Sequence, residues 1–179
     1  MEIVCYLGGT CGDLVAAVID PTGARLLGPA VHHASDRVRL KKPHLFDDNT
    51  AKDTYLRSVS ANSISSHDLD YHVRRKHNFI TIVISNRPAA DWAAERFRAL
   101  HRPEVWQEMQ EKCGAQDVDG YAQIMLDYSN MVIQHAWKHV NLEDIIAGRL
   151  ISVLQQDFGI IPSPRAQDFY RHWIESQEL

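Results

Sequence analysis

Apolar and polar positions along the chain follow a pattern that predicts a mixed α/β fold. A short apolar run of strand type, Glu2–Leu7, leads through a glycine-rich turn into Asp13–Asp20, which has helical character. The run Asn78–Ser85 is β-branched and apolar on both faces, which is typical of a central strand in a parallel sheet. A helix over Arg87–Leu100, with Pro88 in its first turn, is expected to follow it.

The other segments are mainly of helical character. A helix over Thr50–Val59, capped by Asn49 or Asp48, is predicted to precede the central strand. Further helices are predicted over Pro103–Lys112, Val118–His139, Leu142–Gln156 and Pro164–Ser176. We therefore expect one domain over residues 1–179, with a sheet-forming half (1–87) and a mainly helical half (88–179).

The turn Gly8-Gly9-Thr10-Cys11-Gly12 lies between the first strand and the first helix. A strand, a glycine-rich turn and a helix together present backbone amides to an anion, so phosphate binding is the first hypothesis. A complete loop of this kind has a lysine and a hydroxyl residue after its last glycine, whereas Asp13 and Leu14 follow Gly12 here. A tight connection without a ligand is the alternative interpretation.

Composition narrows the class of protein and its compartment. The chain has 179 residues, of which 45% are hydrophobic and 23% charged, as in an ordinary globular domain. Its net charge of −4 gives no overall attraction to nucleic acid, so such a contact would depend on a local basic patch such as Arg74-Arg75-Lys76. Scattered cysteines, no signal-peptide pattern and no apolar run of about 20 residues favour a cytoplasmic protein without membrane contact.

Transfer of a phosphoryl or sulfuryl group to a hydroxyl needs an anion cradle, positive charge and a group that takes the acceptor proton. The turn amides would supply the cradle, and His67 or Asp68 would act as the base. Asp13 stands where the lysine would be, so the positive charge must come from elsewhere. The candidates are Arg37, Arg39, Lys41, Lys42 and Arg87.

Three other roles stay open for residues of these motifs. Asp13 either holds a metal ion or stabilises the helix N-terminus as a first-turn acid. The spacing of His67-Asp68 and of Asp70 with His72 also invites a metal site. Cys11 lies in an amide-rich turn that is expected to lower its pKa, which would make it a reactive thiol.

The order of several motifs carries a resemblance. After the glycine turn come Ser66-His67-Asp68, a strand that ends at Ser85-Asn86-Arg87-Pro88, and Asn141-Leu142-Glu143-Asp144 before the last helices. This order resembles the sulfotransferase branch of the P-loop transferases and covers most of the chain. It implies an α/β fold with a three-layer P-loop-like parallel sheet and a helical C-terminal layer.

The resemblance also implies roles for individual residues. Gly8, Gly9, Thr10, Cys11 and Gly12 would bind a nucleotide phosphate, His67 would be the catalytic base, and Arg87 would contact a nucleotide phosphate. The chain departs from the family in lacking a basic residue before Gly12, and its length is closer to that of small P-loop kinases.

The favoured function is therefore a nucleotide-dependent, kinase-like transferase that moves a phosphoryl group to a hydroxyl acceptor. ATP or a related nucleotide with Mg²⁺ would be the cofactor. The acceptor would be a nucleoside, a nucleotide or a modified base, as for the small accessory kinases that viruses encode, in which case the host cytoplasm is the location. Sulfuryl transfer and a non-catalytic binding or regulatory module with the same fold are the alternatives.

Overall fold

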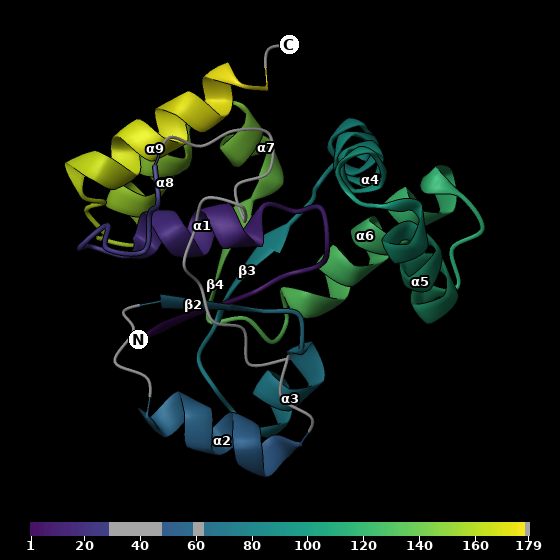
Figure 1. Cartoon of the computed structure of the whole chain (residues 1–179), viewed down its shortest axis with the longest axis horizontal. Coiled ribbons are helices and arrows are strands. Elements are labelled where there is room, and N and C mark those ends of the chain that lie inside the picture. Colours follow the sequence, from purple (N-terminus) through teal and green to yellow (C-terminus); the bar gives the residue numbers. More distant parts are fainter. Residues whose placement is uncertain (29–47, 59–62, 178–179) are drawn as a thin grey trace.

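A sheet of four parallel strands in the order β2-β1-β3-β4 forms the centre of the molecule (Figure 1). Its strands are β1 Glu2–Cys5, β2 Ser63–Ser66, β3 Ile80–Val83 and β4 Lys138–Asn141. The computed structural model describes residues 1–28, 48–58 and 63–177. Since β3 lies between β1 and β4, the prediction of an interior parallel strand within Asn78–Ser85 is confirmed.

Helices connect and cover these strands in the described part of the chain. In chain order they are α1 Gly12–Ile19, α2 Asn49–Ser58, α3 Leu69–Arg74, α4 Arg87–Leu100, α5 Pro103–Cys113, α6 Val118–Val132, α7 Leu142–Ile146, α8 Leu150–Asp157 and α9 Pro164–Glu175. None of these described helices is both long and apolar enough to cross a bilayer. The helix predicted over Arg87–Leu100 has the predicted bounds, with Pro88 in its first turn and the side chain of Asn86 as its cap.

Successive strand residues point to opposite faces of the sheet, and each face has its own apolar core. Val4, Ile82 and Val140 pack in a cluster with residues of α1, α4 and α7–α9. Ile3 and Val83 belong to a second cluster, which includes partly buried residues of α2 and α3. The sheet is thus the middle of three layers, with α1, α8 and α9 above it and α2 and α3 below it in Figure 1.

Two predicted helices in the second half differ from the structure. The helix expected over Val118–His139 ends at Val132, and its last residues contribute to β4 instead. Only Val140 of β4 is buried, so this edge strand lacks the apolar signature of an interior one. The helix expected over Leu142–Gln156 is divided into α7 and α8, because Gly148 takes a left-handed conformation with φ 77°.

The strand order reverses direction at β1. From β1 the chain passes to β2 on one side, and then crosses back to β3 on the other side of β1. Open parallel sheets bind their ligands at such a reversal, beyond the carboxyl ends of the strands. In this protein, the reversal lies between β1 and β3, beside the turn after β1.

Candidate functional site

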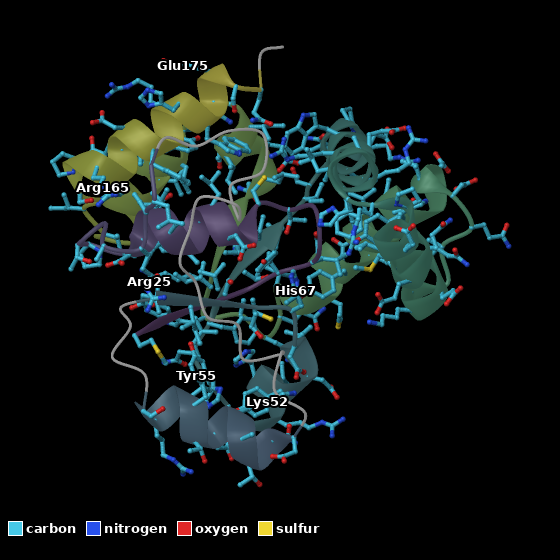
Figure 2. All side chains as sticks on the ribbon, in the orientation of Figure 1. Arg25, Lys52, Tyr55, His67, Arg165 and Glu175 are labelled. Atoms are coloured by element: carbon cyan, nitrogen blue, oxygen red, sulfur yellow. The ribbon has the colours of Figure 1, made fainter. Side chains whose placement is uncertain are left out.

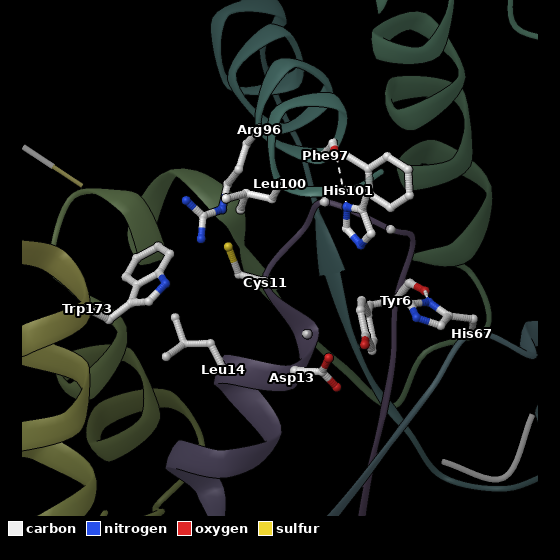
Figure 3. A pocket seen from close by; sticks show the side chains of 13 residues that line it. Tyr6, Cys11, Asp13, Leu14, His67, Arg96, Phe97, Leu100, His101 and Trp173 are labelled. Atoms are coloured by element: carbon white, nitrogen blue, oxygen red, sulfur yellow. Dashed lines mark hydrogen bonds between the residues drawn. The ribbon is translucent and has the colours of Figure 1, made fainter. Parts of the chain in front are cut away.

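A cavity of about 150 Å³ lies at the N-terminus of α1, between the turn after β1, the end of α4 and α9 (Figure 3). The turn after β1, His67, Arg96, His101 and Trp173 contribute to its lining. Ligand pockets commonly measure roughly 300–1,000 Å³. The cavity is therefore of a size for one small group of a ligand, while the rest of a molecule such as a nucleotide would lie outside it.

The glycines of the turn are required by packing against neighbouring protein atoms. A Cβ atom on Gly12 would lie 2.0 Å from the ring of Tyr6. Gly9 has φ +93°, and a Cβ there would lie 2.7 Å from the carbonyl oxygen of Ala93. Substitutions at these glycines would therefore disturb the packing of the turn itself, and they cannot serve as clean tests of phosphate binding.

The first turn of α1 opens on the cavity. Cys11 is the N-cap residue, in a left-handed conformation with φ 62°, and it makes no side-chain capping bond. The first amides of a helix have no intrahelical acceptor, and the helix dipole places partial positive charge there. Gly12, Asp13 and Leu14 line the cavity, so this end of α1 favours an anion. Thr10 is turned away, since its hydroxyl donates to the carbonyl oxygen of Leu7 at 2.7 Å.

Asp13 connects the first turn of α1 to its neighbours through hydrogen bonds. The residue is 9% exposed, and its carboxylate accepts a hydrogen bond of 2.7 Å from the hydroxyl of Ser65 in β2. Burial and the neighbouring Asp13 carboxylate raise the pKa of Tyr6 well above its ordinary value, so the phenol stays protonated and donates to Asp13. These bonds tie β1, α1 and β2 together, as an anchoring acid of the first helical turn would.

Arg96 brings positive charge to the turn. Its guanidinium lies over the rings of Trp92 and Trp173, at 5.2 and 5.3 Å from their centroids. It also hydrogen-bonds to Cys11 and to the side-chain oxygen of Gln177. Burial lowers the pKa of Arg96, but an arginine remains charged at neutral pH. Figure 3 shows this guanidinium pointing into the cavity beside Cys11.

Two imidazoles line the same cavity in a defined tautomer. Nδ1 of His67 bonds to the carbonyl oxygen of Tyr6 at 2.9 Å, and Nδ1 of His101 bonds to that of Phe97 at 2.8 Å. A carbonyl oxygen only accepts, so Nδ1 carries the proton in each ring and the basic lone pair is on Nε2. The ring of His67 also packs on Tyr6, with centroids 4.2 Å apart. This tautomer of His67 suits the predicted role of a base.

Asp68 does not line the cavity. Its side chain accepts from the backbone nitrogen of Tyr71 as the N-cap of α3, and it forms an ion pair with Lys52. Burial acts to raise the pKa of Asp68, but the bonds from Lys52 and Tyr71 outweigh burial, and its pKa is lowered. Figure 2 shows Lys52 on α2, below His67. The structure thus gives Asp68 a capping role.

The predicted positive residues have different placements. Arg87 lies on the surface, where it pairs with Asp91 at 2.6 Å and with Asp119, and it is not among the residues lining the cavity. Arg37 and Arg39, together with Lys41 and Lys42, lie outside the described residues.

The residues present do not fit Mg²⁺. Among the described residues no three of His, Cys, Asp and Glu are grouped as metal ligands would be. Magnesium prefers oxygen ligands such as carboxylates. The Asp13 carboxylate is engaged with Ser65 and Tyr6, and the hydroxyl of Thr10 with Leu7. The metal site considered around His67 is not formed either, because Asp70 pairs with Arg74 on the surface.

The expected reactive thiol is not found at Cys11. Burial raises its pKa to about 11, against an ordinary value of 9.0, and the opposing influence of Arg96 is smaller. The thiol is therefore neutral near pH 7. Desolvation outweighs the helix N-terminus at this position, which is the reverse of the expectation from sequence.

Arg96, His101 and Trp173 are the site residues that sequence reasoning missed. One signal for Arg96 was present: it follows Ala89 and Ala93 by seven and three residues, and both alanines are buried. An arginine on the apolar stripe of a helix is a candidate for a functional contact. His101 and Trp173 carry no comparable signal, because His101 follows the last residue of α4 and α9 reaches the site through tertiary packing.

Comparison with protein-family models, with curated proteins and with solved structures finds no match to this chain.

Proposed function

We propose that this protein is a nucleotide-dependent transferase that moves a sulfuryl group onto a hydroxyl acceptor. The observation that carries the proposal is the meeting of the first turn of α1 with the guanidinium of Arg96 in one cavity. Backbone amides at a helix N-terminus and an arginine are the elements with which proteins hold phosphate and sulfate groups.

His67 supports a transfer reaction in addition to binding. Its Nε2 would take the proton of the acceptor hydroxyl as the hydroxyl oxygen bonds to the transferred group. The bond from that group to the nucleotide phosphate would break, and negative charge would develop on the phosphate oxygen. The amides of α1 and the guanidinium of Arg96 would stabilise this charge.

The charge of the cavity favours sulfuryl over phosphoryl transfer. A terminal phosphoryl group carries up to about two negative charges at neutral pH, whereas a sulfuryl group carries one. Kinases compensate the larger charge with Mg²⁺ and a loop lysine. In this chain Asp13 follows Gly12 in place of that lysine, and the described residues do not fit Mg²⁺. Phosphoryl transfer is the competing outcome of the test below.

Thermal denaturation with three ligands tests the proposal. We would compare 3′-phosphoadenosine 5′-phosphosulfate, ATP and ATP with MgCl₂. The sulfate-donor nucleotide should stabilise the protein without Mg²⁺, by about 2.7 kcal/mol at a hundredfold excess over Kd. Stabilisation only by ATP with MgCl₂ would favour phosphoryl transfer over sulfuryl transfer. Binding without turnover of any hydroxyl acceptor would favour a non-catalytic module, and no stabilisation by any nucleotide would reject the proposal.

A pair of variants on α4 ties this binding to the cavity. Arg96→Gln removes the guanidinium at the turn, and it should weaken nucleotide binding by roughly 1.5–3 kcal/mol, the contribution of a charge-assisted hydrogen bond. Arg98→Gln is the matched control, because Arg98 is exposed on the same helix and pairs only with Glu95 in the described part of the chain. Equal binding by both variants would remove Arg96 from the site.

A further inference from the structure

Trp173 has a buried hydrogen-bond donor without an acceptor among the described residues. Its side chain in α9 is 0% exposed, and its Nε1 has no hydrogen-bond partner in the described part of the chain. Buried donors in native proteins are nearly always paired, so an exception needs an explanation. Tyr170 stacks on this indole with centroids 6.2 Å apart, which fixes the orientation of the ring.

The unpaired donor faces the cavity at α1. Trp173 is one of the lining residues, and Figure 3 shows its indole nitrogen on the side of the ring that faces Cys11 and Leu14. The guanidinium of Arg96 lies over the same indole. The contacts with Arg96 and Tyr170 hold the ring in this orientation.

Trp173, Arg96 and the first turn of α1 each bring hydrogen-bond donors to this end of the cavity. An indole N–H and a guanidinium have no acceptor atoms, and the amides of the first turn of α1 also donate. The Asp13 carboxylate, an acceptor, lies toward Tyr6 at the other end (Figure 3). The complementary ligand is a group with several acceptor oxygens and negative charge, small enough for a cavity of about 150 Å³. A tetrahedral oxyanion has these properties.

We propose that the α9 end of the cavity is a subsite for a sulfate or phosphate group, and that Trp173 Nε1 donates to one of its oxygens. The group is either a free inorganic ion or part of a larger molecule. Its assignment to a nucleotide rests on the proposed function, whereas the subsite itself does not.

Nuclear magnetic resonance of the indole N–H groups tests the subsite directly. The chain has four tryptophans, so ¹⁵N-labelled protein gives four indole signals, and Trp173→Phe identifies the one that belongs to Trp173. We would titrate sodium sulfate and sodium phosphate against sodium chloride at constant ionic strength. The Trp173 proton signal should move downfield with sulfate or phosphate and not with chloride. An unmoved Trp173 signal at saturating anion would overturn the proposal.

Calorimetry of the same variant gives a second readout. Trp173→Phe keeps an aromatic ring and removes the N–H, so sulfate binding should weaken about tenfold or more, the usual effect of losing a bond to a charged group. Trp137→Phe is the control, because Trp137 is 53% exposed and does not line the cavity. Unchanged affinity in a folded Trp173→Phe protein would contradict the subsite. If this variant does not fold, the indole signal of the parent protein decides.

Nucleotide titrations separate this proposal from the proposed function. If inorganic sulfate moves the Trp173 signal and no nucleotide binds, the subsite stands for a free ion and the transferase proposal fails. If a nucleotide binds with dependence on Arg96 and the Trp173 signal does not move, the transferase proposal stands and the subsite fails. If both occur, the subsite holds the anionic group of a nucleotide.

Discussion

Two strand-to-helix connections lie side by side at the carboxyl edge of the sheet, and they treat their backbone amides differently. After β3, the amides of Ser85 and Asn86 donate to one carboxylate oxygen of Glu143, at 2.8 and 3.1 Å. After β1, Cys11 is the N-cap residue of α1 and makes no side-chain capping bond. The protein thus supplies its own carboxylate to one amide cluster, while the first turn of the other helix faces a cavity.

The comparison teaches where an external anion would bind. Glu143 already satisfies the connection after β3, and its negative charge disfavours a second anion there. We call the connection after β3 the filled connection and the connection after β1 the open connection. The helix α4 begins at the filled connection, and its residue Arg96 lies at the open connection. We infer that the two neighbouring turns have separate tasks, with one holding the fold together and the other receiving a ligand.

Loss of His67 is the change expected to have the largest effect at the open connection. General bases typically contribute about 100- to 10,000-fold, so His67→Ala should lower turnover by at least the smaller factor. Affinity for the nucleotide should change by less than about tenfold, because the imidazole acts on the acceptor. Steady-state kinetics and calorimetry give the two numbers. His172→Ala, on the exposed face of α9, is the control. Turnover per folded molecule equal to that of the control would contradict the catalytic role.

The thiol of Cys11, at the open connection after β1, should be unreactive. Burial raises the pKa of Cys11 to about 11 from 9.0, so its thiolate fraction at pH 8 is about a hundredfold smaller than in the unfolded chain. Alkylation by iodoacetamide, followed by mass spectrometry, should be slower by about that factor and should accelerate as pH rises toward 11. The same peptide in urea provides the reference. Equal rates in the native and unfolded protein would show that the thiol is not buried as described.

Removal of Glu143 should convert the filled connection into an open one. Glu143→Ala leaves the amides of Ser85 and Asn86 without their acceptor, at a cost of about 1–3 kcal/mol in the free energy of unfolding. Added sulfate should restore part of this loss in the variant, beyond its effect on the parent protein. Urea denaturation measures both, with Glu175→Ala at the exposed end of α9 as the control. A Glu143→Ala protein as stable as the parent would mean that the two connections do not differ as proposed.

The parts of the fold with a strong local pattern could be predicted from the sequence. β3 is apolar on both faces because the sheet buries it from both sides, and α4 has its own proline and asparagine signals at its start. β4 could not be predicted, because an edge strand that buries only Val140 resembles the end of a polar helix. The division of the second half at Gly148 depends on one backbone conformation, φ 77°, which a helical pattern does not reveal.

The candidate site, too, could be predicted only in part from the sequence. The turn after β1 and His67 were expected in one site, and both line the cavity. The strand that brings His67 to this edge of the sheet, β2, was not expected from the sequence. The positively charged residue of the site could not be predicted. Arg96 is the tenth residue of α4, and whether Arg96 or Arg87 lies at the turn depends on how the helix packs. Trp173 enters the site only because α9 docks on α1, a contact between opposite ends of the chain.

A crystal structure with bound selenate tests the central claim most directly, because selenium gives an anomalous signal and selenate has the shape and charge of sulfate. We predict a selenium peak in the cavity at α1, with its oxygens within hydrogen-bond distance of the amides of Gly12–Leu14, the guanidinium of Arg96 and Nε1 of Trp173. Selenate bound only elsewhere on the surface, with the cavity at α1 containing no peak, would contradict the account.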